Sequence, residues 1–308
     1  MADRPPPTRT RPRPERTTTV AAAHRPGLRG RLGDALFRGV AGPGGPESRR
    51  RVHGTPGPRW FAPDRPIRVV HGDASMFPGG LAALLLQSLH PLAMTAVADH
   101  SDYRNDPWGR LARTSTFLAY TTYGAADDAQ RAVDRVRAVH ENIRGRTPDG
   151  EPYHAADPHL LAWVHCAEAY CFLTAHQRYG KRPLDAAGRD AYVADMARVA
   201  TALGIENPPT TLAELRDRLD SYRPELRLTP QTREAVRYIL LRPPLPKPVL
   251  PPYLVLGAAA VSLLPAWSRE QLGLPVLPHA ERWGVNPAGA AVTALIRWLL
   301  PPQPQLRA

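Results

Sequence analysis

The sequence predicts an all-α protein: a single helical domain at 66–300, preceded by a disordered basic tail at 1–65 and followed by a short tail at 301–308. Two observations support this prediction. From 67 to 241 the apolar residues recur with helical spacing, and no stretch alternates cleanly enough for a strand. The 308 residues, of which 43% are hydrophobic, are also enough for one large core with a deep apolar pocket.

Most of the net charge lies in the N-terminal tail. Residues 1–65 hold fourteen Arg and five acids, which accounts for nine of the twelve net positive charges. They are rich in Pro and Gly and poor in apolar residues, so we expect disorder there apart from a short helix near 32–40. A nucleic-acid footprint clusters on a folded face, and the rest of the chain is nearly balanced, so we expect no nucleic-acid partner.

The cysteines and the N-terminus suggest where the protein works. Cys166 and Cys171 are five apart in one predicted helix, where they point to different sides and cannot easily form a disulfide. The sequence has no Cys/His zinc spacing and no apolar run of a secretory signal near its start. These features favour a cytoplasmic protein without structural zinc.

Proline and glycine place the helix boundaries. We expect breaks at 106–107, 124, 147–150, 157–158, 180–183 and 207–209. Asp157 is a typical N-cap and Pro158 a typical first helical residue, so this pair predicts a helix that runs to about Tyr179.

Two apolar segments have the composition of membrane spans. Residues 81–97 contain no charge, but His90-Pro91 interrupts them and their length is at the lower limit for a bilayer, so we predict a buried core helix. Residues 253–267 are fewer and contain Pro265. They are either a core helix or a hydrophobic surface that rests on a membrane.

The predicted helix at 108–120 carries polar side chains on one face. At positions i, i+3, i+4 and i+7 it has Arg110, Arg113, Thr114 and Phe117. The simplest interpretation is a solvated arginine face. Alternatively, the two guanidinium groups and the hydroxyl hold an anionic group or donate hydrogen bonds to bound oxygen.

The next predicted helix, 129–144, has one histidine on its apolar stripe. His140 shares that face with Val133, Val136 and Ile143. It is either a core histidine bonded to a backbone carbonyl or the axial ligand of a haem, which needs only one neutral imidazole facing an apolar cavity.

Other histidines give weaker signals. His159 and His165 are six apart and lie on different helix faces, so they do not form a paired metal site, although His165 could bond to Glu168. We expect His90 to be buried and hydrogen-bonded, near the edge of a pocket. The sequence lacks a phosphate-binding loop and a nucleophile elbow, and its one Glu-x-x-His match, Glu151 to His154, lies in a predicted loop.

Several short segments occur in an order typical of one family. They are HP at 90–91, HSDYR at 100–104, DP at 106–107, RLART at 110–114, VHENIRG at 139–145, GEPY at 150–153, ADP at 156–158 and LAWVH at 161–165. In this combination the chain resembles the family of the mycophenolic-acid-pathway oxygenase MpaB and rubber oxygenase (latex clearing protein). The resemblance spans about 79–215.

The resemblance implies a helical fold with a globin-like core around haem b, and dioxygen chemistry on an apolar alkene. It makes His140 the proximal iron ligand, and Arg110 and Thr114 distal-side residues. Arg113 falls where a rubber oxygenase has a lysine that can ligate iron, but a guanidinium stays protonated, so we expect water or an open sixth position. The stretch 91–98 lacks the acid that assists the rubber enzymes, which argues against rubber as the substrate.

We therefore hypothesise a haem b oxygenase that acts with dioxygen on a hydrophobic small molecule or polymer. His140 would bind iron, Arg110 and Arg113 would orient a propionate or oxygen, and Thr114 would supply a distal hydrogen bond. Further candidates for the pocket are His90, His165 and Phe117, with 81–97 as its apolar lining. The alternative is a non-catalytic haem- or lipid-binding module that docks on a membrane through 253–267 and its Arg-rich tail.

Overall fold

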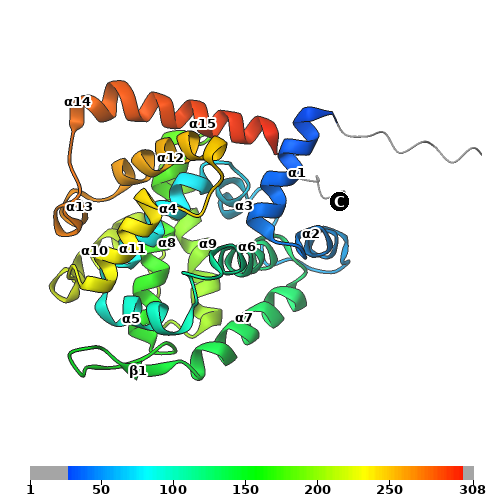
Figure 1. Ribbon diagram of the computed structural model, residues 1–308. Coiled ribbons are helices and arrows are strands. Elements are labelled where there is room, and N and C mark those ends of the chain that lie inside the picture. The colour runs from blue at the N-terminus through cyan, green and yellow to red at the C-terminus, as the bar shows by residue number, and fades with distance from the viewer. Residues whose placement is uncertain (1–26, 301–308) are drawn as a thin grey trace, which may run out of the picture.

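The computed structural model describes residues 27–300, and in this part of the chain the regular structure is almost entirely helical, as predicted (Figure 1). The first half contains α1 (Leu28–Ala41), α2 (Gly45–Gly54), α3 (Pro66–His71), α4 (Met76–Gln87), α5 (Pro91–His100), α6 (Pro107–Tyr123) and α7 (Ala126–Glu141). The second half contains α8 (Pro158–Tyr179), α9 (Ala186–Leu203), α10 (Leu212–Ser221), α11 (Pro230–Leu241), α12 (Leu250–Leu263), α13 (Ala266–Leu272), α14 (Pro278–Ala280) and α15 (Asn286–Leu299). Short 3-10 turns, η1 (Arg223–Glu225) and η2 (Lys247–Val249), and a π turn, η3 (Glu281–Val285), join them.

Helix boundaries follow the local chemistry of the sequence. The Asp157 carboxylate accepts a hydrogen bond from the backbone N–H of His159 at 2.8 Å, Pro158 occupies the first turn, and α8 ends at Tyr179. At the start of α6, Asp106 accepts from the N–H of Gly109 at 2.9 Å. Both caps satisfy N–H groups that a helix start leaves unpaired, so both predicted boundaries are confirmed.

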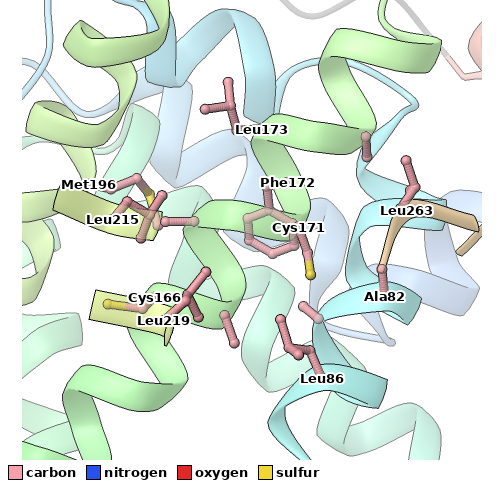
Figure 2. Packing of buried hydrophobic residues seen from close by; sticks show 14 of the residues in the cluster. Ala82, Leu86, Cys166, Cys171, Phe172, Leu173, Met196, Leu215, Leu219 and Leu263 are labelled. Atoms are coloured by element: carbon pink, nitrogen blue, oxygen red, sulfur yellow. The ribbon is translucent and has the colours of Figure 1, made fainter. Parts of the chain in front are cut away.

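The core is built around α8. This helix packs against α4, and Figure 2 shows Cys171 and Phe172 of α8 among side chains that include Ala82 and Leu86 of α4 and Leu215 of α10. Each fully buried leucine contributes roughly 1.5–3 kcal/mol relative to an exposed one. Both cysteines of the chain are buried and free, as their spacing predicted.

The apolar segment 81–97 lies in the core but forms two helices. α4 and α5 meet at an angle of 108° where His90-Pro91 interrupts the pattern. Proline has no N–H to donate and disfavours helical backbone in the residue before it, and His90 is accordingly extended, with φ −82° and ψ 116°. Leu85 and Leu86 are fully buried beside α8. That residues 81–97 line a substrate pocket stays a prediction.

Residues 253–267 lie mostly in α12, which packs against α4 and α15. Ala259, Ala260 and Leu263 are buried, so this segment is a core helix, the first of the two interpretations that the sequence allowed. Among residues 27–300 no single helix is long and apolar enough to cross a membrane. Two sharply bent pairs of helices, α4 with α5 and η2/α12 with α13, are together long and apolar enough for a membrane span, judged by length and composition only.

The predicted disorder of 1–65 is wrong for the part that the structure describes. The short helix predicted near 32–40 is confirmed as α1, but the chain also forms α2, and Val52 of α2 and Phe61 of the following segment are buried in spite of the polar composition around them. Composition averages over a segment, whereas single well-placed apolar side chains can attach it to an existing core. Residues 1–26 and the predicted tail at 301–308 lie outside the described residues.

A short antiparallel β-hairpin also departs from the prediction. β1 (Arg144–Arg146) pairs with β2 (Pro152–His154), with Gly145 opposite Tyr153. Strands of three residues are too short to produce a visible alternation in the sequence. The predicted break at 147–150 is the turn between them, with Gly150 in the left-handed region at φ +86°.

Candidate functional site

The predicted site residues lie on two helices that form a hairpin. Only Gly124 and Ala125 separate α6 from α7, and the two helices pack against each other. Arg110 on α6 is fourteen residues before Gly124, and His140 on α7 is fifteen residues after Ala125. At a rise of 1.5 Å per residue both lie about 21–23 Å from the connection, so they share the open end of the hairpin.

The last turn of α5 holds this open end together. Arg110 donates a hydrogen bond from Nη1 to Oγ of Ser101 at 3.0 Å. On the other side, Tyr153 of the β-hairpin that follows α7 donates to Oδ2 of Asp99 at 2.8 Å, and its hydroxyl lies 3.1 Å from Nε2 of His100. The chain segments next to Arg110 and to His140 therefore meet at the same end of one helix.

Arg110 is a half-buried cation without an ion-pair partner among the described residues. Burial lowers the pKa of its guanidinium, and the nearby Tyr103 and Glu168 only partly oppose this effect. Buried cations are normally paired with an anion, because desolvation of an unpaired charge is costly. The environment of Arg110 is therefore suited to an anionic group from outside the chain.

His140 is half-buried near the end of α7. Burial lowers the pKa of its imidazole, so the ring is neutral at pH 7. Within residues 27–300 the ring has no hydrogen bond, ion pair or ring contact, so the interpretation of His140 as a core histidine bonded to a backbone carbonyl does not hold. A neutral imidazole with both nitrogens unused is available to ligate a metal.

The other predicted residues of α6 have different environments. Arg113 is exposed, and its Nη1 lies 3.2 Å from Oδ2 of Asp106, so it does not share the burial of Arg110. Thr114 is exposed, and Phe117 is half-buried against the main core. The face predicted from the spacing is present, but only Arg110 combines burial with an unpaired charge.

His165 and Glu168 lie one turn apart in α8. Burial lowers the pKa of His165 to about 4, and its Nε2 has no partner within the described part of the chain. Burial also raises the pKa of Glu168 to about 7, against the opposing effects of Gln87 and Arg110. The structure shows no hydrogen bond between His165 and Glu168, although the sequence allowed one.

Glu168 is a residue that sequence reasoning missed as a member of the site. Its carboxyl group is the one described carboxylate that acts electrostatically on the guanidinium of Arg110. The signal was present, because Glu168 is the only Asp, Glu, Lys or Arg between 158 and 177. A single acid in a long uncharged helix is rarely buried without a purpose.

The remaining candidate, His90, is buried near the start of α8, beside His159 and Trp163, and belongs to a different cluster of side chains. Two open depressions of the described surface, of about 490 Å³ at the end of α9 and about 440 Å³ on α11, are lined by none of the predicted residues. The site is therefore defined by the chemistry of Arg110, His140 and Glu168, and neither of these two depressions marks it.

Comparison with known proteins agrees with the resemblance seen in the sequence. No curated protein and no solved structure shows significant similarity to the chain. A family model described as "ER-bound oxygenase mpaB/B'/Rubber oxygenase, catalytic domain" matches residues 68–300, which is most of the chain. The chain therefore belongs to the mpaB/rubber oxygenase catalytic-domain family, a family of oxygenases.

Proposed function

We propose that the protein is a haem b-dependent oxygenase that acts with dioxygen on a hydrophobic alkene of isoprenoid type. The observation that carries the proposal is the imidazole of His140, which is neutral, half-buried and without a partner among the described residues. A b-type haem needs one such imidazole from a helix. Family membership supports the oxygenase activity itself.

Arg110 fits another part of a haem. A haem carries propionates, and Arg110 is a half-buried guanidinium that lacks an anion. A haem also has flat apolar faces, but the exposed apolar residues next to Arg110 and His140 in the sequence, Trp108, Leu111 and Val139, are one or two positions away in their helices and point to other sides.

When bound, haem iron supplies the activation of dioxygen, and the protein supplies binding and orientation. Arg110 would hold a propionate through its guanidinium, which stays protonated at all working pH values. Thr114, one turn further along α6, offers a hydroxyl as a hydrogen-bond donor. Glu168 holds a proton on its carboxyl group close to neutral pH, where a small change of environment would release it.

The experiment that tests this proposal compares haem content in two pairs of variants. The protein is expressed with added haem precursor, and bound haem b is measured by the pyridine haemochrome assay. We expect near-stoichiometric haem in the wild type and none in His140→Ala. His154→Ala is the matched control, because His154 is a half-buried histidine of the adjacent β-hairpin whose ring lies near Glu141. Haem retention by His140→Ala at the wild-type level would refute the assignment of the ligand.

The second pair separates Arg110 from Arg113 on the same helix. Arg110→Met should weaken haem retention, because the buried partner of a propionate is lost. Arg113→Met should have a smaller effect, since its guanidinium is exposed and already paired with Asp106. Equal haem loss in both variants would contradict the role that burial gives to Arg110.

The predicted cytoplasmic location stays a prediction from the sequence.

A further inference from the structure

Three metal-ligating side chains from distant parts of the chain meet at the start of α8. His90 lies between α4 and α5, His159 lies in the first turn of α8, and Glu225 is the last residue of η1. One ligand atom from each of them lies within 4.8 Å of the other two. Neither the family match nor the proposed haem site uses these three residues together.

His90 is the buried member of this cluster. Its side chain is 2% exposed and packs beside the rings of Trp163 and Tyr222, with centroids 6.1 and 6.3 Å away. Neither ring nitrogen has a hydrogen-bond partner in the described chain, although Nε2 is 3.3 Å from Oε2 of Glu225. Buried polar groups almost always have a hydrogen-bond partner, so a buried nitrogen that faces a carboxylate without bonding to it is suited to bind an ion between the two groups.

The ring of His159 directs Nε2 toward the carboxylate of Glu225, where an ion could replace the proton of this hydrogen bond. Its Nε2 lies 2.9 and 3.0 Å from the two carboxylate oxygens of Glu225. On the opposite side of the ring, Nδ1 lies 3.5 Å from the hydroxyl of Tyr222, which donates to the backbone oxygen of His159 at 2.8 Å. A polar partner for the second nitrogen fixes the tautomer of a metal-bound histidine and directs the other nitrogen to the ion.

One of the two distances to Glu225 matches the edge of a tetrahedral site. With bonds of about 2.0–2.2 Å from zinc to nitrogen or oxygen, neighbouring ligand atoms are about 3.3–3.6 Å apart. His90 and Glu225 are separated by 3.3 Å, whereas His159 and Glu225, at 2.9 Å, are at hydrogen-bond distance and would have to move slightly apart around an ion. The side chains of His159 and Glu225 are 56% and 42% exposed, so they can rotate slightly and an ion can reach them from solvent.

We propose that His90, His159 and Glu225 form a binding site for a divalent transition-metal ion of the zinc class, with a fourth position open to water. Two imidazoles and one carboxylate are ligands that zinc prefers, whereas calcium requires six or more oxygens. The sequence predicted no structural zinc because it contains no Cys/His motif. The fold assembles this site from residues that are 69 and 66 positions apart.

This site is separate from the one proposed for haem. His159 and Glu168 are nine residues apart in α8, which places them about 13 Å from each other along the helix. An ion bound by the three residues would join the starts of α5 and α8 to η1, and His90 and His159 also contact the aromatic rings of Trp163 and Tyr222. Metal binding should therefore raise the thermal unfolding temperature of the full chain.

The test is calorimetric titration of the full chain with ZnCl₂, after removal of any affinity tag and treatment with a chelator. We expect the wild type to bind one Zn²⁺ per chain, and His159→Gln and Glu225→Gln to bind it at least tenfold more weakly. Both changes are at exposed side chains, so folding, followed by circular dichroism, should be retained. The matched control is His154→Gln, because His154 lies 3.6 Å from one carboxylate, that of Glu141, but has no third ligand among residues 27–300.

A second readout is the visible spectrum with Co²⁺ in place of Zn²⁺, which reports tetrahedral coordination. We expect that spectrum in the wild type and in His140→Ala, so loss of haem and loss of zinc would be distinguishable. Absence of zinc binding by the wild type would overturn the proposal. Wild-type affinity in both His159→Gln and Glu225→Gln would overturn it as well.

Discussion

The buried carboxyl group of Glu168 predicts an unusual pH dependence of stability. Burial raises its pKa from 4.5 to about 7, so the folded protein keeps the proton over a range in which the unfolded chain has lost it. Unfolding therefore releases a proton between about pH 4.5 and 7, and the free energy of unfolding falls as the pH rises. This is the opposite of the behaviour of a salt-bridged carboxylate, whose pKa is lowered by folding.

The size of the effect follows from the shift. One pKa unit corresponds to about 1.4 kcal/mol, so a shift from 4.5 to about 7 corresponds to about 3–4 kcal/mol at most. This stability is fully present below about pH 4.5 and is lost above about pH 7. In Glu168→Gln the side chain cannot ionise, so this variant should lack that part of the pH dependence.

Urea denaturation at several pH values between 5 and 8 measures the effect. The difference in unfolding free energy between Glu168→Gln and the wild type should move in favour of the variant by up to about 3–4 kcal/mol as the pH rises. The exposed Glu206→Gln is the control, and its difference from the wild type should stay constant. A constant difference for Glu168→Gln as well would refute the reasoning.

Three further predictions concern stability and can be measured by urea denaturation at pH 7. Gly33→Ala should cost roughly 1–3 kcal/mol, because a Cβ atom at Gly33 would collide with the backbone oxygen of Leu299; an unchanged midpoint would mean that α1 is not docked on α15. Asp195→Ala should cost roughly 1–3 kcal/mol, because it removes the buried carboxylate to which Nε of Arg65 donates at 2.8 Å. The prediction fails if the losses of stability in Asp195→Ala and Arg65→Ala simply add in the double variant. Leu86→Ala should cost about 2–5 kcal/mol, and a loss below 1 kcal/mol would contradict its complete burial.

The parts of the structure that the sequence predicted well depend on neighbouring residues. Asp157-Pro158 specifies a helix start by one hydrogen bond and one fixed φ angle, both of which involve residues within a few positions. The shared face of Arg110 and Thr114 likewise follows from helical spacing alone. Helical spacing cannot predict the burial of Arg110, because that burial depends on α5 and α8, which are distant in the sequence.

The cluster of His90, His159 and Glu225 shows what local patterns cannot predict. Helical spacing correctly separates His159 from His165 on α8, which removes one metal site from consideration. It contains no information about His90 and Glu225, which reach His159 only through the packing of α4, α8 and α10. The energetic signal for this cluster is a buried imidazole without a partner, and burial is known only from the three-dimensional structure.

The two N-terminal helices, of which the sequence predicted the first but not the second, connect this part of the chain to the candidate site. α1 and α2 precede the matched region at 68–300, and both pack against α6, the helix that carries Arg110 and Thr114. Ser115 of α6 donates a hydrogen bond to the backbone oxygen of Val40 at 2.9 Å. Because one face of α6 is fixed in this way from outside the matched region, the position of Arg110 depends on α1 and α2 as well as on the hairpin with α7. Substitutions that displace α1 or α2 should therefore shift α6 and, with it, the position of Arg110.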